Sequence, residues 1–240
     1  VDLLKSAAYF SIPFDDGKGS IAIAGQRSYL DLMLGLVAPD AGFSLSYWDY
    51  QLRVTYAFAP ETQLSVFFMG SGDSLDSAAQ QDAASYEEEN PADTVFGTMF
   101  HRMLVRFEHG FTRDLRMRSD SLLGYNVTEL RATQDFVLEI DSYVVRERLS
   151  FIYDATHWLE LRAGVDVDAT ILRADITAPD FDALGDIPDP SFESAIADFA
   201  LRSERVGLAT FLSAEIRPMV CLRILPGLRV DWFDYNGSRH

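Results

Sequence analysis

Arginine is almost the only basic residue in this chain. Lys occurs only at positions 5 and 18 among the 20 basic residues. A guanidinium group forms planar, paired hydrogen bonds with carboxylates and other oxyanions, and it tolerates partly desolvated sites better than an ammonium group. The arginines are therefore candidates for binding an anionic ligand or, as we favour, for ladders of ion pairs with carboxylates. The ligand-binding candidates are Arg102, Arg106, Arg116, Arg118, Arg146 and Arg148.

A second set of residues matches a hydrolase motif. Gly72-Asp73-Ser74-Leu75 is the sequence that names the GDSL hydrolases, and the segment 154–157 matches their Asp-x-x-His element. A serine nucleophile requires His157 within hydrogen-bonding reach of Ser74. The Gly-x-Asn-Asp element that would supply oxyanion donors is missing. Whether the motif can act depends on where the two segments lie in the fold.

Acidic residues are concentrated in two segments, 72–94 and 177–198, which contain no basic residue. They account for most of the formal net charge of -17. Such segments could collect cations or hold Ca²⁺ through oxygen ligands, but the spacing in 72–94 does not fit an EF-hand loop. We expect solvated, self-repelling loops instead. We predict no metal site and no cofactor.

Composition excludes several classes of protein. The single cysteine, Cys221, excludes a disulfide scaffold and a zinc site that needs several thiolates. An acidic chain without clustered basic residues is unsuited to nucleic acid. No run approaches the roughly 18 apolar residues of a membrane-spanning helix, and residues 1–6 show no signal-peptide pattern. At 48% hydrophobic residues, the chain is too apolar to be disordered.

Alternation of polar and apolar residues dominates the elements that must position these side chains. In 47–58 the even positions, from Trp48 to Phe58, are aromatic or aliphatic, while the odd positions include Asp49 and Arg53. A helix would scatter these charges around its circumference, whereas a strand places them on one side. The alternation therefore predicts strands, and it persists over segments that are long for a soluble protein.

The same pattern predicts about ten antiparallel strands, joined alternately by short turns and long loops. The stretch 29–37 fits a short helix or a continued strand equally. Because every second connection of an up-and-down sheet lies at the same end, the long loops share one rim and the turns share the other. The expected strands are 7–13, 19–25, 47–58, 63–71, 97–109, 114–128, 136–153, 158–174, 199–217 and 221–233, with long links near 26–46, 72–96, 129–135 and 175–198.

Long two-faced strands with alternating loop lengths are typical of an outer-membrane β-barrel. Burying polar-face groups such as Arg106, Glu108 and Asp166 in a dry core would be prohibitive unless all were paired. A water-filled or plugged lumen removes that cost, and lipid then covers the apolar face. We predict an all-β fold, an antiparallel up-and-down transmembrane barrel or barrel segment, with one domain over residues 1–240.

This placement argues against catalysis. Ser74 falls at the loop rim and His157 in a short turn at the opposite rim, a strand length apart. Ten-stranded outer-membrane proteases carry their catalytic groups at the loop rim. His101 is the only histidine near that rim, and alternation places it with Met99, Met103 and Val105 on the outward apolar face. We therefore predict that the protein is not an enzyme. The aromatic residues expected at the lipid interfaces are Trp48, Tyr50, Trp158 and Trp232.

Three stretches resemble the barrel region of TonB-dependent outer-membrane receptors. They are GSIAIAGQRSY at 19–29, YWDYQLR at 47–53 and LPGLRVD at 225–231. The resemblance implies a 22-stranded barrel with a plugged lumen, energised uptake of a scarce ligand such as a metal chelate or cobalamin, and a periplasmic coupling protein. Ten strands are less than half that number, no plug or coupling motif precedes them, and residues 236–240 lack a terminal aromatic. We therefore expect an internal segment of a longer protein.

The function implied by this resemblance is that of a receptor or transporter barrel in the outer membrane of a Gram-negative cell. Expected partners are outer-membrane lipid, the plug domain, the coupling protein and a small-molecule ligand, but not nucleic acid. The alternatives are a passive porin-like or structural barrel and an outer-membrane hydrolase.

Overall fold

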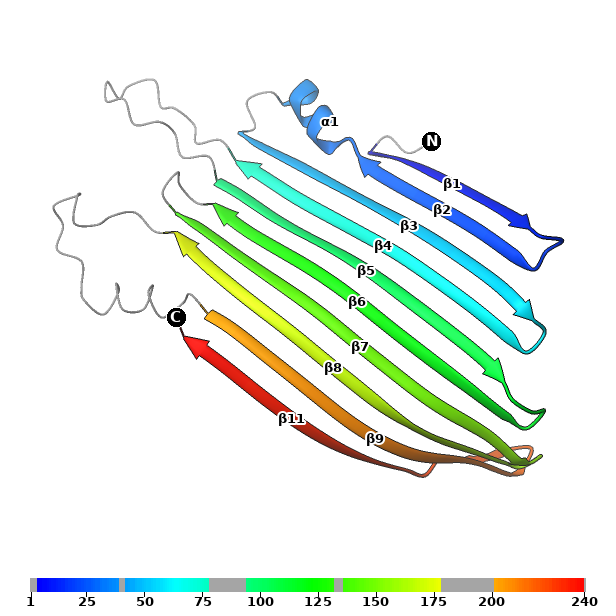
Figure 1. Cartoon of the computed structure of the whole chain (residues 1–240). Helices are drawn as coiled ribbons and strands as arrows, with labels where there is room; N and C mark the ends of the chain where they lie inside the picture. The colour runs from blue at the N-terminus through cyan, green and yellow to red at the C-terminus, as the bar shows by residue number, and fades with distance from the viewer. Residues whose placement is uncertain (1–3, 39–41, 78–93, 132–135, 178–200, 240) are drawn as a thin grey trace, which may run out of the picture.

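One antiparallel sheet and one short helix make up the described part of the chain, which in the computed structural model is residues 4–38, 42–77, 94–131, 136–177 and 201–239 (Figure 1). No helix within these ranges is long and apolar enough to cross a membrane. The elements are β1 (Lys5–Phe14), β2 (Gly19–Ser28), α1 (Leu30–Val37), β3 (Phe43–Ala59), β4 (Thr62–Ser77), β5 (Thr94–Gly110), β6 (Leu115–Arg131), β7 (Val137–Thr156), β8 (Leu159–Thr177), β9 (Leu201–Met219), β10 (Leu222–Ile224) and β11 (Gly227–Arg239).

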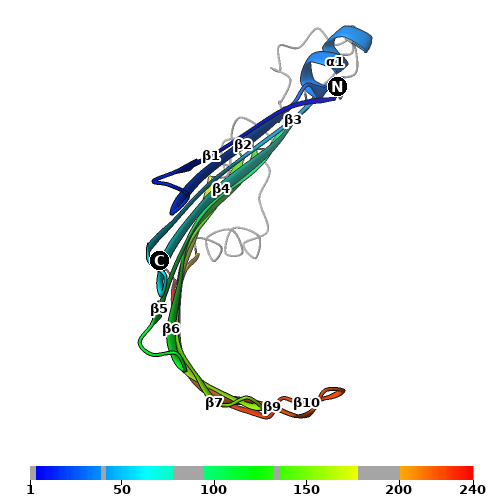
Figure 2. The ribbon, with the colours of Figure 1, turned by 90° about the vertical axis from the view of Figure 1, so that its right-hand side faces the viewer.

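The strands follow one another across the sheet in sequence order, and every pairing is antiparallel. Each strand from β1 to β9 pairs with the next, and β10 and β11 both pair with β9. The all-β, up-and-down prediction is thus confirmed. Among the described strands β1 does not pair with β10 or β11, so the sheet is open. Figure 2 shows it from the side as a strongly curved wall.

One expected strand is divided in two, and one undecided segment is a helix. The strand expected at 221–233 is divided into β10 and β11, because Pro226 has no N–H to donate to a ladder. The Pro226 carbonyl still accepts a hydrogen bond from Ala214 N at 2.9 Å. The undecided stretch 29–37 contains the helix α1, whose first turn holds Asp31 near the positive end of the helix dipole.

The strands also extend further at the loop rim than predicted. β4 continues to Ser77, so Asp73 and Asp76, expected in an acidic loop, belong to a strand. Gly70 and Gly72 interrupt the apolar alternation there, which hid the continuation. The remaining acidic residues of the two segments lie at 78–93 and 178–200, outside the described residues.

Short turns join the strands at one end of the sheet. In the β1–β2 turn, Asp15 and Asp16 both have φ of 51° and Gly17 has φ of 86°. Asp and Gly are among the residues that best tolerate this left-handed region. The predicted alternation of short turns with longer connections is therefore confirmed where the chain is described.

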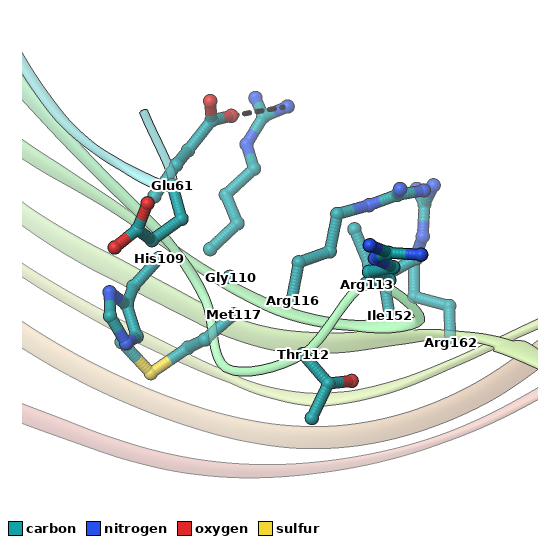
Figure 3. A pocket seen from close by; sticks show the side chains of 11 residues that line it. Glu61, His109, Gly110, Thr112, Arg113, Arg116, Met117, Ile152 and Arg162 are labelled. Carbon is teal, nitrogen blue, oxygen red and sulfur yellow. Dashed lines mark ion pairs between the residues drawn. The ribbon is translucent and has the colours of Figure 1, made fainter. Parts of the chain in front are cut away.

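The strand register gives the sheet two chemically distinct faces. One face, here called the apolar face, includes a row of mostly aliphatic residues that crosses the whole sheet. The row consists of Ile12, Ile21, Val54, Val66, Val105, Ser121, Glu147, Val167, Leu208 and Trp232. The opposite face, here called the polar face, contains the ligand-binding candidates. Figure 3 shows Arg116 and Arg162 on the concave side of the strands.

The sheet has almost no core of its own. Among the described residues, the buried apolar side chains are only Ile152, Ala174 and Ala209. Many large apolar side chains are exposed, including Tyr9 at 73%. An exposed apolar surface of this extent marks a membrane or partner contact rather than a water-facing surface.

Candidate functional site

A ladder of ion pairs crosses the polar face from β5 to β8. Arg106, Asp120, Arg148 and Asp166 lie directly opposite one another on four consecutive strands. Arg106 Nε is 2.6 Å from Asp120 Oδ1, and Arg148 Nε is 2.7 Å from Asp166 Oδ1. Opposite charges facing one another across strands stabilise the pairing. The alternating charges therefore link the four strands through their side chains.

The ladder continues to β11 by passing over β9. The residue of β9 in this row is Ala209, whose small side chain is buried. Arg229 of β11 crosses above it and donates to Asp166. Asp166 thus accepts from arginines on both sides, Arg148 and Arg229.

Carboxylates shared by two arginines are the rule on this face. Asp120 contacts both Arg106 and Arg118 at 2.6 Å. Asp168 contacts Arg146 at 2.5 Å and Arg205 at 2.9 Å. Asp120, Asp166 and Asp168 each pair with two arginines, and two of these six arginines also pair with Glu108 or Asp231. Five carboxylates thus face six arginines, so the ladder is close to neutral rather than strongly basic.

Five of the six ligand-binding candidates have carboxylate partners. The exception is Arg102, which donates to the carbonyls of His101 and Tyr125 at 2.9 and 3.1 Å and to the Asn126 side chain. Arg102 forms no ion pair with a described residue, and its guanidinium carbon lies 5.2 Å from the Phe100 ring centroid. The geometry therefore fits the ladder interpretation of the candidates.

An open cavity of about 500 Å³ lies on this side of the sheet at the turn end (Figure 3). Arg116 links two acids there, with Nη1 3.0 Å from Asp154 and Nη2 3.0 Å from Glu160. Arg113, in the β5–β6 turn, also lines the cavity and forms no ion pair within the described part of the chain. The cavity is lined by Glu61, Glu108, His109, Gly110, Thr112, Arg113, Arg116, Met117, Arg118, Ile152 and Arg162.

The hydrolase motif is not assembled. Ser74 lies within β4 near the loop rim, and its hydroxyl is 2.8 Å from that of Ser46. His157 lies in the β7–β8 turn at the opposite end of the sheet. A serine and a histidine separated in this way cannot form a nucleophile–base pair.

His101 lies on the apolar face, as its parity predicted. Its Nδ1 is 2.7 Å from the Tyr50 hydroxyl, and Trp48 stacks on Tyr50 with ring centroids 5.9 Å apart. These rings cover two glycines of β4: a Cβ added to Gly72 would lie 2.7 Å from the Trp48 ring. The cluster places amphipathic rings toward the loop end of the apolar face, as expected at a lipid interface.

One group of polar residues was missed by the sequence analysis. Glu147 lies on the apolar face of β7, opposite Ser121 of β6. Glu147 alternates along β7 with Val145 and Leu149, which are apolar. This alternation could have predicted from the sequence that Glu147 lies on the apolar face.

Comparisons with known proteins show likeness in structure only. No family model matches the sequence, and neither does any curated protein. The ferripyoverdine receptor of the outer membrane of Pseudomonas aeruginosa, bound to ferripyoverdine, matches with a TM-score of 0.62 at 12% identity, over 98% of this chain and 36% of the receptor. The siderophore receptor PiuA from Acinetobacter baumannii matches with a TM-score of 0.54 at 8% identity, over 97% of this chain and 44% of PiuA.

The chain therefore has a fold similar to part of the barrel of these outer-membrane receptors. It spans less than half the length of either solved receptor. A pyocin S2 complex of FpvAI matches equally well, with a TM-score of 0.61 at 12% identity over 98% of this chain and 37% of that one. These neighbours are receptors rather than enzymes.

Proposed function

We propose that this chain forms part of the wall of an outer-membrane receptor barrel that imports a small ligand. The observation that supports this most directly is the division of a single curved sheet into an apolar face and a concave face of ion pairs. In water such a sheet would expose its apolar face, whereas in a bilayer lipid covers it.

The apolar face has the height expected of a membrane band. On β7 the outward side chains run from Tyr143 to Tyr153, and Tyr143 packs against Tyr125 with ring centroids 4.7 Å apart. The interval is about ten residues or roughly 33 Å of strand, which at a tilt near 45° covers about 23 Å of membrane. Tyrosines at both limits suit the two lipid–water interfaces.

The polar face suits a lumen. The arginines of the ladder are about half exposed, with Arg148 at 55% and its partner Asp166 at 14%. Ion pairs that border water avoid most of the desolvation cost of a dry core. A wet or plugged interior is therefore the environment in which this face is stable.

The proposals for the imported ligand and for the energy source of uptake rest on resemblance to other proteins. The solved neighbours are described as receptors for ferripyoverdine and for a siderophore. By analogy, the imported ligand of the complete protein is a metal chelate, its uptake is energised through TonB, and a plug domain fills the lumen. The ligand-binding candidates remain a proposal as well, and their carboxylate partners favour a role in holding the wall together.

Uptake by cells tests this function. A strain lacking the gene, grown under iron limitation, is expected to lose uptake of at least one labelled ferric chelate, and loss of TonB should have the same effect. Uptake that needs the gene but persists without TonB would instead indicate a passive pore. Unchanged uptake of every chelate tested would contradict import of a metal chelate.

A further inference from the structure

The helix α1 follows β2 at the loop end of the sheet, and its large exposed side chains are all apolar (Figure 1). Leu32, Met33, Leu36 and Val37 are between 38% and 81% exposed. Because successive helical residues are about 100° apart, these four side chains share an arc of about 140°, here called the exposed arc. The exposed arc is therefore a surface that water solvates poorly.

The opposite side of α1 faces the sheet. A cavity of about 480 Å³ separates it from the loop ends of β3, β4 and β5. The strand residues that line this cavity include Ser44, Asp76 and Val95, which lie directly opposite one another in a row of the apolar face. The two sides of the helix thus differ: one faces the strand ends, and the exposed arc faces away from them. The helix residues that line the cavity are Asp31, Leu34, Gly35 and Ala38.

An ion pair holds α1 on the apolar side of the wall. Arg27 Nη2 is 3.2 Å from Asp31 Oδ2. The register places Arg27 on the apolar face, directly opposite Trp48 of β3. Beyond Trp48, the next residues of this face on β3 are Ser46 and Ser44. The apolar face of β3 therefore ends at the row of Arg27 and Trp48, where a tryptophan suits the lipid–water interface. Because α1 is anchored at this limit, its exposed arc continues the apolar face.

We propose that α1 is an interfacial helix, and that its exposed arc inserts into the lipid leaflet on the loop side of the membrane. This inference rests on the proposed function, because it requires lipid on the apolar face. Interfacial helices lie in the plane of the membrane and bury their apolar side about 5–10 Å into the boundary between headgroups and acyl chains. Continuity with the apolar face identifies lipid as the occupant, since the same leaflet meets both surfaces.

Insertion also stabilises a helix that is short. Isolated helices of fewer than roughly 12–15 residues are marginal in water, and α1 has eight residues. Transfer of one leucine side chain out of water favours the inserted orientation by about tenfold or more, and Leu32 and Leu36 lie side by side one turn apart. Asp31 lies outside the exposed arc, so insertion of the arc buries no charge.

Fluorescence quenching of the full-length protein in lipid vesicles tests the insertion. Single cysteines that carry a small fluorophore are placed in a Cys221→Ser background, because Cys221 is exposed. Leu36→Cys reports on the exposed arc. Gly35→Cys is the matched control on the side that lines the cavity, where an added Cβ would meet nothing within 4 Å. Ile23→Cys, on the apolar face of β2, reports on the strand surface and is 49% exposed.

Two quenchers separate lipid from water: a phospholipid with a nitroxide near the top of its acyl chain, and iodide in the buffer. The nitroxide lipid should quench the label of Leu36→Cys about as strongly as that of Ile23→Cys, and much more strongly than that of Gly35→Cys. Adding Leu32→Glu places a charge in the exposed arc, and the lipid quenching at residue 36 should then be lost, because a carboxylate opposes transfer out of water. A shift in gel mobility on heating shows that each variant is folded.

Several results would overturn the inference. Quenching of Leu36→Cys by iodide but not by lipid would place the exposed arc in water, and quenching by neither would indicate that protein covers it. Lipid quenching that survives Leu32→Glu would show that the apolar arc does not drive insertion. If lipid quenches Ile23→Cys but not Leu36→Cys, only this inference fails, whereas absence of lipid quenching at Ile23→Cys refutes the proposed function.

Discussion

At the scale of single residues, the ladder places each arginine between acids, so reversing a charge creates repulsion as well as removing attraction. Arg116 faces Asp154 and Glu160, and Arg118 faces Asp120 and Glu108. We expect the double variant Arg116→Glu/Arg118→Glu to lower the free energy of unfolding by about 2 kcal/mol, because each partly exposed pair contributes only about 0.2–1 kcal/mol before repulsion is added. Uptake by the fraction that still folds should be unchanged.

Unfolding in lipid vesicles, followed by gel mobility, measures this effect. Arg53→Glu is a suitable control, since Arg53 lies on the polar face over the Phe67 ring at 5.1 Å and forms no ion pair with a described residue. Loss of uptake at unchanged stability would show that Arg116 and Arg118 bind ligand.

Asp15, in the β1–β2 turn, gives a pH dependence. The Tyr56 hydroxyl donates to Asp15 at 2.6 Å and Lys18 lies 3.7 Å away, and these contacts hold the pKa of Asp15 below its usual value. The stability that the ionised Asp15 contributes to the folded state is therefore fully present above the pKa of Asp in the unfolded chain, near 3.9. This stability is lost as the pH falls through the lower pKa of Asp15 in the folded state. Asp15→Asn should abolish this part of the acid sensitivity below about pH 4, whereas Asp16→Asn should not. Identical acid profiles of melting temperature for the two variants would contradict the assignment.

At the scale of elements, close packing between strands limits one glycine of β8. A Cβ added to Gly164 would lie 2.4 Å from the backbone oxygen of Leu149 and 2.6 Å from the Phe211 ring. Backbone in a ladder cannot move aside, so Gly164→Ala is expected to destabilise the sheet by about 1–3 kcal/mol. Gly97→Ala is the control, because its Cβ would meet nothing closer than Asp73 O at 4.0 Å. Equal urea midpoints for the two variants in vesicles would show that the strands have room to adjust.

The sequence was sufficient to predict the strands and their faces, because alternation depends only on side-chain type. The turn ends of the strands were predicted to within one to three residues, for example at Thr62 and Leu115, where turn residues mark them. Loop ends were placed less well, since polar and glycine residues continue β4 to Ser77 beyond the apolar alternation. The helix α1 was left undecided, because eight mostly apolar residues fit the repeat of a helix as well as the two-residue repeat of a strand.

The pairing of side chains at the candidate site could not be predicted in the same way. Alternation along each strand predicted that Arg148 and Asp166 lie on the same face. Only the register between β7 and β8 places them directly opposite each other. Register depends on turn geometry and on bulges such as the one between Asp154 and Thr156. The contact of Arg229 with Asp166 also skips a strand, which no pairwise pattern anticipates.

At the scale of the whole molecule, the described strands form an open wall in which β1, β10 and β11 have no second neighbouring strand among the described residues. Unpaired backbone groups are not tolerated in the hydrocarbon of a bilayer. We therefore expect both edges to pair with further strands when the protein is in the membrane. Likeness to less than half of each solved receptor agrees with a wall that forms one part of a larger barrel.

The central claim, that lipid covers the apolar face, is tested most directly by fractionation and gel mobility. The protein should remain with the outer-membrane fraction until detergent is added, and its mobility on a denaturing gel should change on boiling as the barrel unfolds. Recovery as a folded monomer in detergent-free buffer, with no change on boiling, would contradict the claim.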